Sequence, residues 1–141
     1  MENRHGLAAD GRLTQANGTA ERRASEAMLK RRSKARRITV GEDKAYDTAD
    51  HIVALRHMDV TLHVAQNDTA RRSAIDRRTT RHDGYGMSQS RLPMIECQFG
   101  WGKQHGTMRK TKHRGIAAVA ADFLLNLIAY NLVRIPKLIA A

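Results

Sequence analysis

Two acidic residues of this sequence, Asp43 and Glu96, stand where carboxylates can hold a metal ion. Asp43 follows a short β-prone stretch, and Glu96 falls on a helix predicted later in the chain. Carboxylates that converge from separate elements bind one or two Mg²⁺ or Mn²⁺ ions, which prefer oxygen ligands. In a two-metal site, one ion activates the attacking water or hydroxyl and the other stabilises the leaving oxygen at phosphorus. Spacing alone leaves another interpretation open, because each acid near Asp43 can equally be a helix cap or a solvated charge: Glu42, Asp47 and Asp50.

A cation, Lys103, follows Glu96 at the seventh position, which is nearly the same azimuth on a helix. The helix would therefore present a carboxylate and, about 10 Å further along its axis, a cation suited to a DNA phosphate. The alternative is an exposed amphipathic helix with mixed charges. Spacing alone favours that alternative.

The chain is strongly basic, with 25 Lys and Arg against 14 Asp and Glu and a formal net charge of +11 in 141 residues. Such a balance, with a pI near 10.7, predicts a polyanionic partner. Nucleic acid is the first candidate and an anionic membrane surface the second. A basic solvated surface without a dedicated ligand remains the third interpretation.

Other kinds of site find little support in the sequence. The single cysteine, Cys97, excludes an intramolecular disulfide and a thiolate zinc cluster, and it fits a reducing bacterial cytoplasm. The seven histidines show no tight ligand spacing, which argues against zinc. The sequence contains no phosphate-binding glycine loop of the Walker or Rossmann kind.

The first half of the chain predicts an α/β fold. A helix is expected over 20–30, followed by a basic run, 30–37, that we interpret as a solvated loop. A strand over 38–41, a helix over 49–58 and an alternating strand over 60–65 come next. The strand–helix–strand order predicts a βαβ unit with parallel strands.

The remaining chain predicts two helices after a polar stretch. Residues 66–92 are rich in Arg, Thr and Asp, and we expect an exposed polar loop there. Pro93 suits the first turn of a helix that runs to about Lys103. The C-terminal helix is expected over 115–135, with Pro136 ending it.

The C-terminal helix raises the alternative of a membrane-associated protein, because 116–133 is nearly long enough to span a bilayer. Asp122, Asn126 and Tyr130 fall on one helical stripe within it. A carboxylate near the centre of a bilayer costs about 3 kcal/mol. We therefore expect a half-buried helix that docks on the domain, and no membrane association.

Seven stretches in order resemble transposases of the DDE type, in the group typed by insertion sequence five. The blocks read MENRHGL (1–7), TVGEDKAYD (39–47), LHVAQN (62–67), RRSAIDRRTTRHDGY (71–85), IECQFGWGK (95–103), RKTKHRG (109–115) and AYNLVRIPKL (129–138). Each block alone is weak, but together they cover nearly the whole chain.

The resemblance implies a ribonuclease-H-like catalytic domain that cuts and joins DNA at transposon ends with two divalent ions, Mg²⁺ or Mn²⁺. The family's second acidic ligand falls on Asp43 and its third on Glu96. The family's lysine seven residues after that glutamate falls on Lys103. DNA is the implied partner, and a homo-oligomer is compatible with the resemblance. The candidate DNA contacts are Arg91, Lys103, Arg109, Lys110, Lys112 and Arg114.

The departures from the family pattern lead to the expectation of a truncated transposase. The family's first catalytic Asp lies upstream of the MENRHGL block, with which this chain begins. The family's Arg four residues before Glu96 is replaced by Leu92, although Arg91 stands one place away. We therefore predict a single domain over 1–141, a partial ribonuclease-H-like fold without its first strand, and no catalysis alone. The alternative is a small basic protein that binds nucleic acid non-specifically.

Overall fold

The computed structural model describes residues 1–33, 37–69 and 72–140, and the chain divides into two compact units. One unit is Gly18–Leu92, and the other combines Met1–Asn17 with the chain from Pro93 onward. Each is described by itself below. The single domain expected over 1–141 stays a prediction, because compact units can be parts of one domain.

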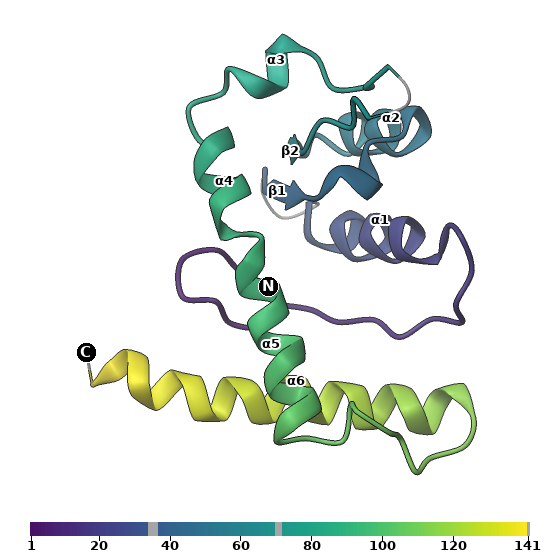
Figure 1. Cartoon of the computed structure of the whole chain (residues 1–141), viewed down its shortest axis with the longest axis vertical. Helices are drawn as coiled ribbons and strands as arrows, with labels where there is room; N and C mark the ends of the chain where they lie inside the picture. The colour runs from purple at the N-terminus through teal and green to yellow at the C-terminus, as the bar shows by residue number, and fades with distance from the viewer. Residues whose placement is uncertain (34–36, 70–71, 141) are drawn as a thin grey trace. The chain divides into compact units, whose positions relative to one another are not determined.

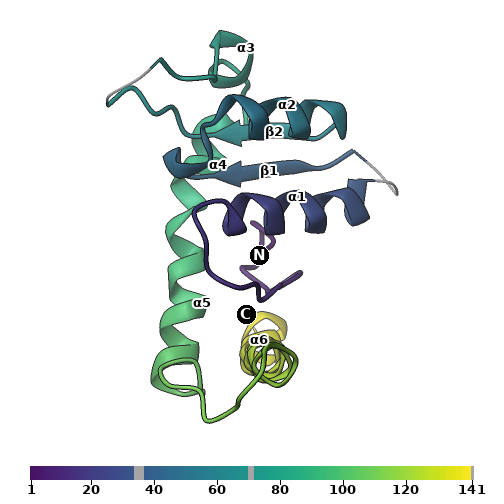
Figure 2. The same cartoon turned by 90° about the vertical axis from the view of Figure 1, so that its right-hand side faces the viewer.

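The unit Gly18–Leu92 is built on the predicted βαβ arrangement. Strands β1 (Thr39–Glu42) and β2 (Thr61–Val64) pair in parallel, with Thr39 opposite Thr61 and Glu42 opposite Val64. Figure 2 shows the two strands running side by side in the same direction. Helix α2 (Ala49–His57) connects them, as the sequence predicts. The prediction of a mixed α/β fold is confirmed, and the fold is consistent with part of a ribonuclease-H-like domain.

The core of this unit lies between the sheet and its helices. Ile52 and Leu55 from α2 pack with Leu62 and Val64 from β2, and all four are buried. Helices α1 (Ala20–Ser33) and α2 lie on one side of the strands, and α4 (Tyr85–Arg91) lies on the other (Figure 1). Burial of four aliphatic side chains, at about 1.5–3 kcal/mol each, makes this cluster the main stabilising element of the unit.

The basic run 30–37 is in part helical. Helix α1 continues three residues beyond the predicted end at Lys30, so Lys30–Ser33 form its last turn, and the interpretation of these four residues as a loop is wrong. Lysine and arginine have good helix propensity and interact favourably with the negative end of the helix dipole. Residues 34–36 of the run lie outside the described residues.

The prediction of an exposed polar loop over 66–92 is wrong. Two helices lie in this stretch: α3 (Arg77–Thr80), whose N-cap Asp76 accepts a hydrogen bond from the Arg78 amide, and α4. Thr79 and Ser88 are buried although they are polar. Because polar residues that form hydrogen bonds occupy the buried positions of these helices, the stretch lacks the apolar periodicity that marks a helix in a sequence.

A buried carboxylate, Asp47, ties the segment that follows β2 to the segment before α2. Asp47 is 1% exposed. Its oxygens accept hydrogen bonds from the amide of Asn67 at 2.7 Å, the hydroxyl of Ser73 at 2.5 Å and the amide of Ala74 at 2.9 Å. Three donors on one ionised acceptor compensate the cost of burying its charge.

The second unit contains two helices, α5 (Pro93–Gln104) and α6 (Ile116–Ile139). The predicted bounds of α5 are confirmed to within one residue. The prediction that Pro136 ends the last helix is wrong, because α6 continues to Ile139 and Ala140 N–H donates to the Pro136 carbonyl. Proline fits a helical φ and removes one hydrogen bond to the carbonyl four residues earlier. That residue, Leu132, is exposed, so water can satisfy its carbonyl.

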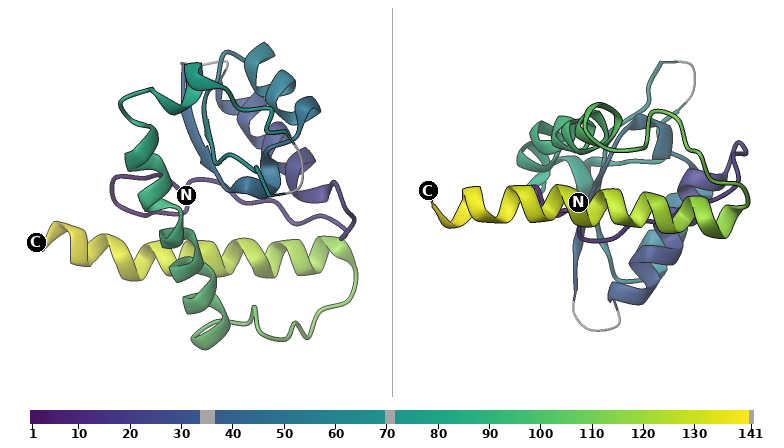
Figure 3. Two further views of the ribbon diagram at one scale, coloured as in Figure 1. Left: turned by 45° about the horizontal axis from the view of Figure 1, so that its top comes forward. Right: turned by 90° about the horizontal axis from the view of Figure 1, so that it is seen from below.

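Helix α6 packs through the stripe expected from the sequence. Asn126 and Tyr130 are buried, and Asp122 is half-buried. Helix α5 crosses α6 (Figure 3), and the Trp101 ring meets the Tyr130 ring edge-on with centroids 5.9 Å apart. The amide of Asn131 pairs with the backbone of Ala8 in both directions, at 2.8 and 2.9 Å, which holds the N-terminal segment on α6.

The opposite face of α6 is apolar and exposed. Leu125, Ile128, Leu132 and Ile139 are each more than half exposed. By length and composition alone, α6 is apolar enough to cross a membrane, a property that it shares with the core helices of many soluble proteins. The helix therefore docks along one stripe, as expected, and leaves more apolar surface open than a half-buried helix would.

Candidate functional site

Asp43 lies directly after β1, at the carboxyl end of a parallel strand. It is the N-cap of a short 3-10 helix, η1 (Lys44–Tyr46), and its Oδ1 accepts a hydrogen bond from the Ala45 amide at 2.7 Å. The side chain is exposed. Ala65 N–H donates to the Glu42 carbonyl at 2.9 Å, so the chain leaving β2 emerges at the same edge. In open α/β sheets, ligands bind outside this edge.

Behind Asp43, the preceding residue Glu42 is buried in a network of polar side chains. Its carboxylate accepts from the Ser25 hydroxyl at 2.5 Å and meets Nε2 of His51 at 2.8 Å. The other ring nitrogen of His51 lies 2.8 Å from Glu26. His51 is 1% exposed, so one imidazole joins α1, β1 and α2 at the strand end that carries Asp43.

The network determines the charge of His51. Burial alone lowers the pKa of this imidazole, but its hydrogen bonds and charge interactions with Glu42 and Glu26 outweigh burial, and the pKa is raised. A protonated ring donates through both nitrogens, which matches two carboxylate acceptors. Burial, with help from Glu21, Glu42 and Asp43, raises the pKa of Tyr46 to about 12, so the phenol next to His51 stays neutral.

Sequence reasoning missed this network. Glu42 was interpreted as a cap or solvated charge, and His51 as one of several unrelated histidines. The signal in the sequence is a spacing: His51 lies on the same turn of α2 as the buried Ile52 and four residues before the buried Leu55, so it faces inward. A histidine on an inward face needs a hydrogen-bond partner.

Glu96 lies in the second unit, in the first turn of α5, with an exposed side chain. The buried positions of α5 are Gln98 and Gly102, so the face that carries Glu96 is open to solvent. Lys103 is also exposed, and it lines a cavity of about 250 Å³ together with Asp122 of α6. The spacing argument that placed Glu96 and Lys103 on one helix is therefore confirmed at the level of secondary structure.

The remaining candidate DNA contacts are exposed basic side chains at two places. Arg91 is the last residue of α4, in the unit that holds Asp43. The connector between α5 and α6 carries the others, in the unit that holds Glu96: Arg109, Lys110, Lys112 and Arg114. The structure thus groups Glu96 with Lys103 and the connector, and it places Asp43 and Arg91 in the other unit.

The donor chemistry of Asp43 and Glu96 fits a hard divalent cation. Both offer exposed carboxylate oxygens, and Mg²⁺ binds such ligands while keeping several waters. Within residues 1–33, 37–69 and 72–140, no group of three or more His, Cys, Asp or Glu side chains is gathered in a metal-binding arrangement. Asp43 and Glu96 are thus two candidate ligands with suitable donor atoms, and they belong to separate units.

Comparison with known families decides the identity of the chain. Residues 53–136 match the model of the transposase DDE domain, which is more than half of the sequence. The chain belongs to the transposase DDE domain family. The transposase resemblance inferred from the sequence blocks is thereby confirmed at the level of the family. No curated protein and no solved structure matches the chain.

The extent of the match bears on each candidate residue of this transposase DDE domain. Glu96, Lys103 and the basic connector fall inside the matched residues, whereas Asp43 lies ten positions before their start. The assignment of Asp43 rests on its sequence block and on its place after β1. The family generally uses divalent metal ions and acts on DNA.

Proposed function

We propose that this chain is part of a transposase of the group typed by insertion sequence five, and that it serves metal-dependent cleavage and joining of DNA at transposon ends. The observation that carries the proposal is the match to the transposase DDE domain over Glu96 and Lys103. The exposed carboxylate of Asp43, directly after a parallel strand, supports it. The bacterial cytoplasm is the compartment that we propose for this reaction.

In this proposal, Asp43 and Glu96 hold Mg²⁺ or Mn²⁺. A divalent ion bound there supplies polarisation of the phosphoryl oxygen and an activated water or hydroxyl. Lys103 and the connector residues around Lys110 neutralise the DNA backbone near Glu96, because exposed Lys and Arg side chains bind phosphates through charge. Glu42 and His51 touch no substrate here; they hold the strand end from which Asp43 projects.

The 141 residues carry two of the three acids that the family resemblance requires. The resemblance assigns no residue of the sequence to the first acid. A two-metal site relies on several carboxylates to hold both ions, so we expect the chain alone to bind DNA without cutting it.

A cleavage assay tests this expectation. The full chain is incubated with labelled transposon-end DNA and Mg²⁺ or Mn²⁺, and products are followed on a denaturing gel. We expect no cleavage or strand transfer above the level without protein, while fluorescence anisotropy on the same mixtures reports binding. Metal-dependent cutting that disappears in Asp43→Asn and Glu96→Gln would overturn the expectation that the 141-residue chain alone does not cut DNA.

A second function, non-specific binding of nucleic acid by a small basic protein, is favoured by the net charge of +11. In that case Asp43 and Glu96 have no role in common. Substituting either one would leave divalent-ion binding at the other unchanged, whereas a shared metal site loses its ion with either substitution. A homo-oligomer is compatible with both functions.

A further inference from the structure

A basic cavity lies at the other end of the two-stranded sheet from Asp43, within the unit Gly18–Leu92. Its volume is about 290 Å³. It is lined by the residues that open β2, including Thr61, by Arg37 just before β1, and by α3. Since Thr39 pairs with Thr61 at the start of both strands and Asp43 follows their ends, this cavity is separate from the candidate metal ligands.

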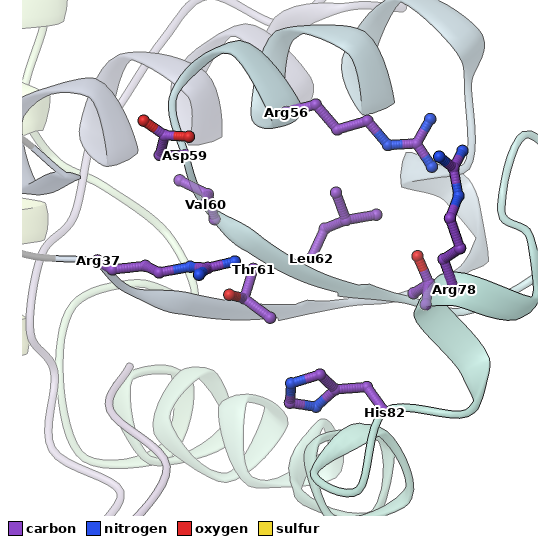
Figure 4. Close-up of a pocket in the computed structure, with 9 residues that line it drawn as sticks. Arg37, Arg56, Asp59, Val60, Thr61, Leu62, Arg78 and His82 are labelled. Carbon is purple, nitrogen blue, oxygen red and sulfur yellow. The ribbon is translucent and has the colours of Figure 1, made fainter.

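Three guanidinium groups, from Arg37, Arg56 and Arg78, line the cavity. Figure 4 shows Arg56 and Arg78 beside each other, with Arg37 reaching toward Thr61 from the opposite side. Arg56 and Arg78 share a single carboxylate, Asp76, at 3.7 and 2.6 Å. Two cations on one anion leave positive charge uncompensated.

The third arginine adds to this excess. Among the described residues, Arg37 forms no ion pair and no side-chain hydrogen bond. Among the described residues, Asp59 is the one carboxylate in the lining, and Asp76 pairs with two of the arginines from outside the lining. Three guanidinium groups therefore face two carboxylates, and the cavity is positive overall.

Polar groups complete the lining, and the ring of His82 is one of them. Nδ1 of His82 lies 3.3 Å from the Gly84 amide and 3.0 Å from Nε2 of His63. Nδ1 of His63 in turn lies 2.7 Å from the Ser88 hydroxyl. These contacts use Nδ1 of His82 and leave its other nitrogen, Nε2, outside this chain of hydrogen bonds.

The backbone of β2 supplies a further donor. Thr61 N–H and Ala65 N–H both donate toward β1, to Ile38 and Glu42. Amides alternate in direction along a strand, so the N–H of Leu62 points away from β1, toward the outer edge of β2. Leu62 is one of the residues that line the cavity.

We propose that this cavity binds a phosphate group, either as a phosphodiester of nucleic acid or as a free phosphate ion. Guanidinium forks match phosphate oxygens in charge and geometry. The amide of Leu62, the hydroxyls of Thr61 and Thr79 and the Nε2 atom of His82 offer further hydrogen bonds around them. The site needs no metal ion, so its test is separate from that of the proposed catalytic function.

The first arm of the test is a titration of the full chain with inorganic phosphate at constant ionic strength, followed by amide chemical shifts. We expect saturable shifts at Leu62 and Thr79. The double variant R37Q/R56Q should weaken phosphate binding about tenfold. The control R77Q/R81Q removes the same charge from exposed arginines that do not line the cavity, and should change the affinity by less than about twofold.

If both double variants weaken phosphate binding equally, the attraction is a diffuse property of the basic surface and the proposed site is overturned. The absence of saturable shifts would also overturn it. Because R37Q/R56Q removes the Arg56–Asp76 pair, Arg37→Gln is measured alone as well; Arg37 has no such pair among the described residues, so its effect reports on binding and not on folding.

The second arm replaces phosphate with a short DNA duplex. If the occupant is a phosphodiester, the duplex shifts the same amides and displaces phosphate, and R37Q/R56Q lowers its affinity more than R77Q/R81Q does. In that case R37Q/R56Q also reduces the slope of log DNA affinity against log salt concentration by about 1–2. If the two double variants bind DNA equally while only R37Q/R56Q loses phosphate, the occupant is free phosphate.

Discussion

Replacing His51 with leucine is expected to lower the free energy of unfolding by about 3–5 kcal/mol near pH 6, the usual cost of removing one partner from a buried ion pair. The substitution leaves the buried Glu42 carboxylate without its histidine partner at 2.8 Å. The measurement is chemical denaturation of the full chain followed by circular dichroism. His57→Leu, an exposed histidine on the same helix, serves as the control and should change stability by less than about 0.5 kcal/mol.

The effect of His51 should depend on pH in a definite direction. The pKa of His51 is raised in the folded chain, so the imidazole binds a proton more tightly there than in the unfolded chain. Its contribution is fully present below the unfolded pKa of about 6.5 and is lost as pH rises through the higher folded value. The difference between the native chain and His51→Leu should therefore shrink on going from pH 6 to pH 9. A difference that is absent at pH 6, or that grows with pH, would contradict a charged imidazole between Glu42 and Glu26.

Asp47→Ala is expected to cost about 2–4 kcal/mol of stability, because it leaves buried donors without an ionised acceptor. The amides of Asn67 and Ala74 and the hydroxyl of Ser73 all donate to this carboxylate. Amide hydrogen exchange should show the loss first in the segment after β2, which Asp47 holds in place.

Two further variants separate the role of Asp47 from a general effect of charge. Asp47→Asn keeps the shape of the side chain but turns an NH₂ group toward donors, so it should recover only part of the loss. Asp50→Asn removes a charge from an exposed position in the first turn of α2 and should be nearly neutral. If Asp50→Asn destabilises the chain as much as Asp47→Asn, the hydrogen-bonded carboxylate is not the cause.

The parts of the fold that were predictable are those with an apolar period. Leu62 and Val64 alternate with polar residues along β2, and Ile52 and Leu55 repeat at helical spacing on α2, so the βαβ order followed from the sequence. The inward stripe of α6 was predictable from helical spacing, although two of its three residues, Asp122 and Asn126, are polar. The helices α3 and α4 were not, because their buried residues Thr79 and Ser88 are polar, and Ser88 meets its partner His63 only in the folded chain.

The candidate site divides in the same way. The placement of Asp43 after a strand and of Glu96 on a helix could be predicted from the sequence, because both are local features. Their role as metal ligands stays a prediction that the family resemblance carries. The supporting residues could not, since Glu42 and His51 reveal their role only when α1, β1 and α2 are folded together. The extension of α6 beyond Pro136 could not be predicted, because a proline in a helical pattern marks the end of the helix in most cases.

Paramagnetic relaxation by Mn²⁺ tests most directly whether Asp43 and Glu96 serve one metal site. Sub-stoichiometric Mn²⁺ is added to the full chain, and the broadening of amide signals is recorded residue by residue. We predict broadening around Asp43 and around Glu96 together, with both sets lost in Asp43→Asn and in Glu96→Gln, and both kept in Asp50→Asn. Broadening that is confined to one of the two acids, or that survives both substitutions, would contradict a shared site.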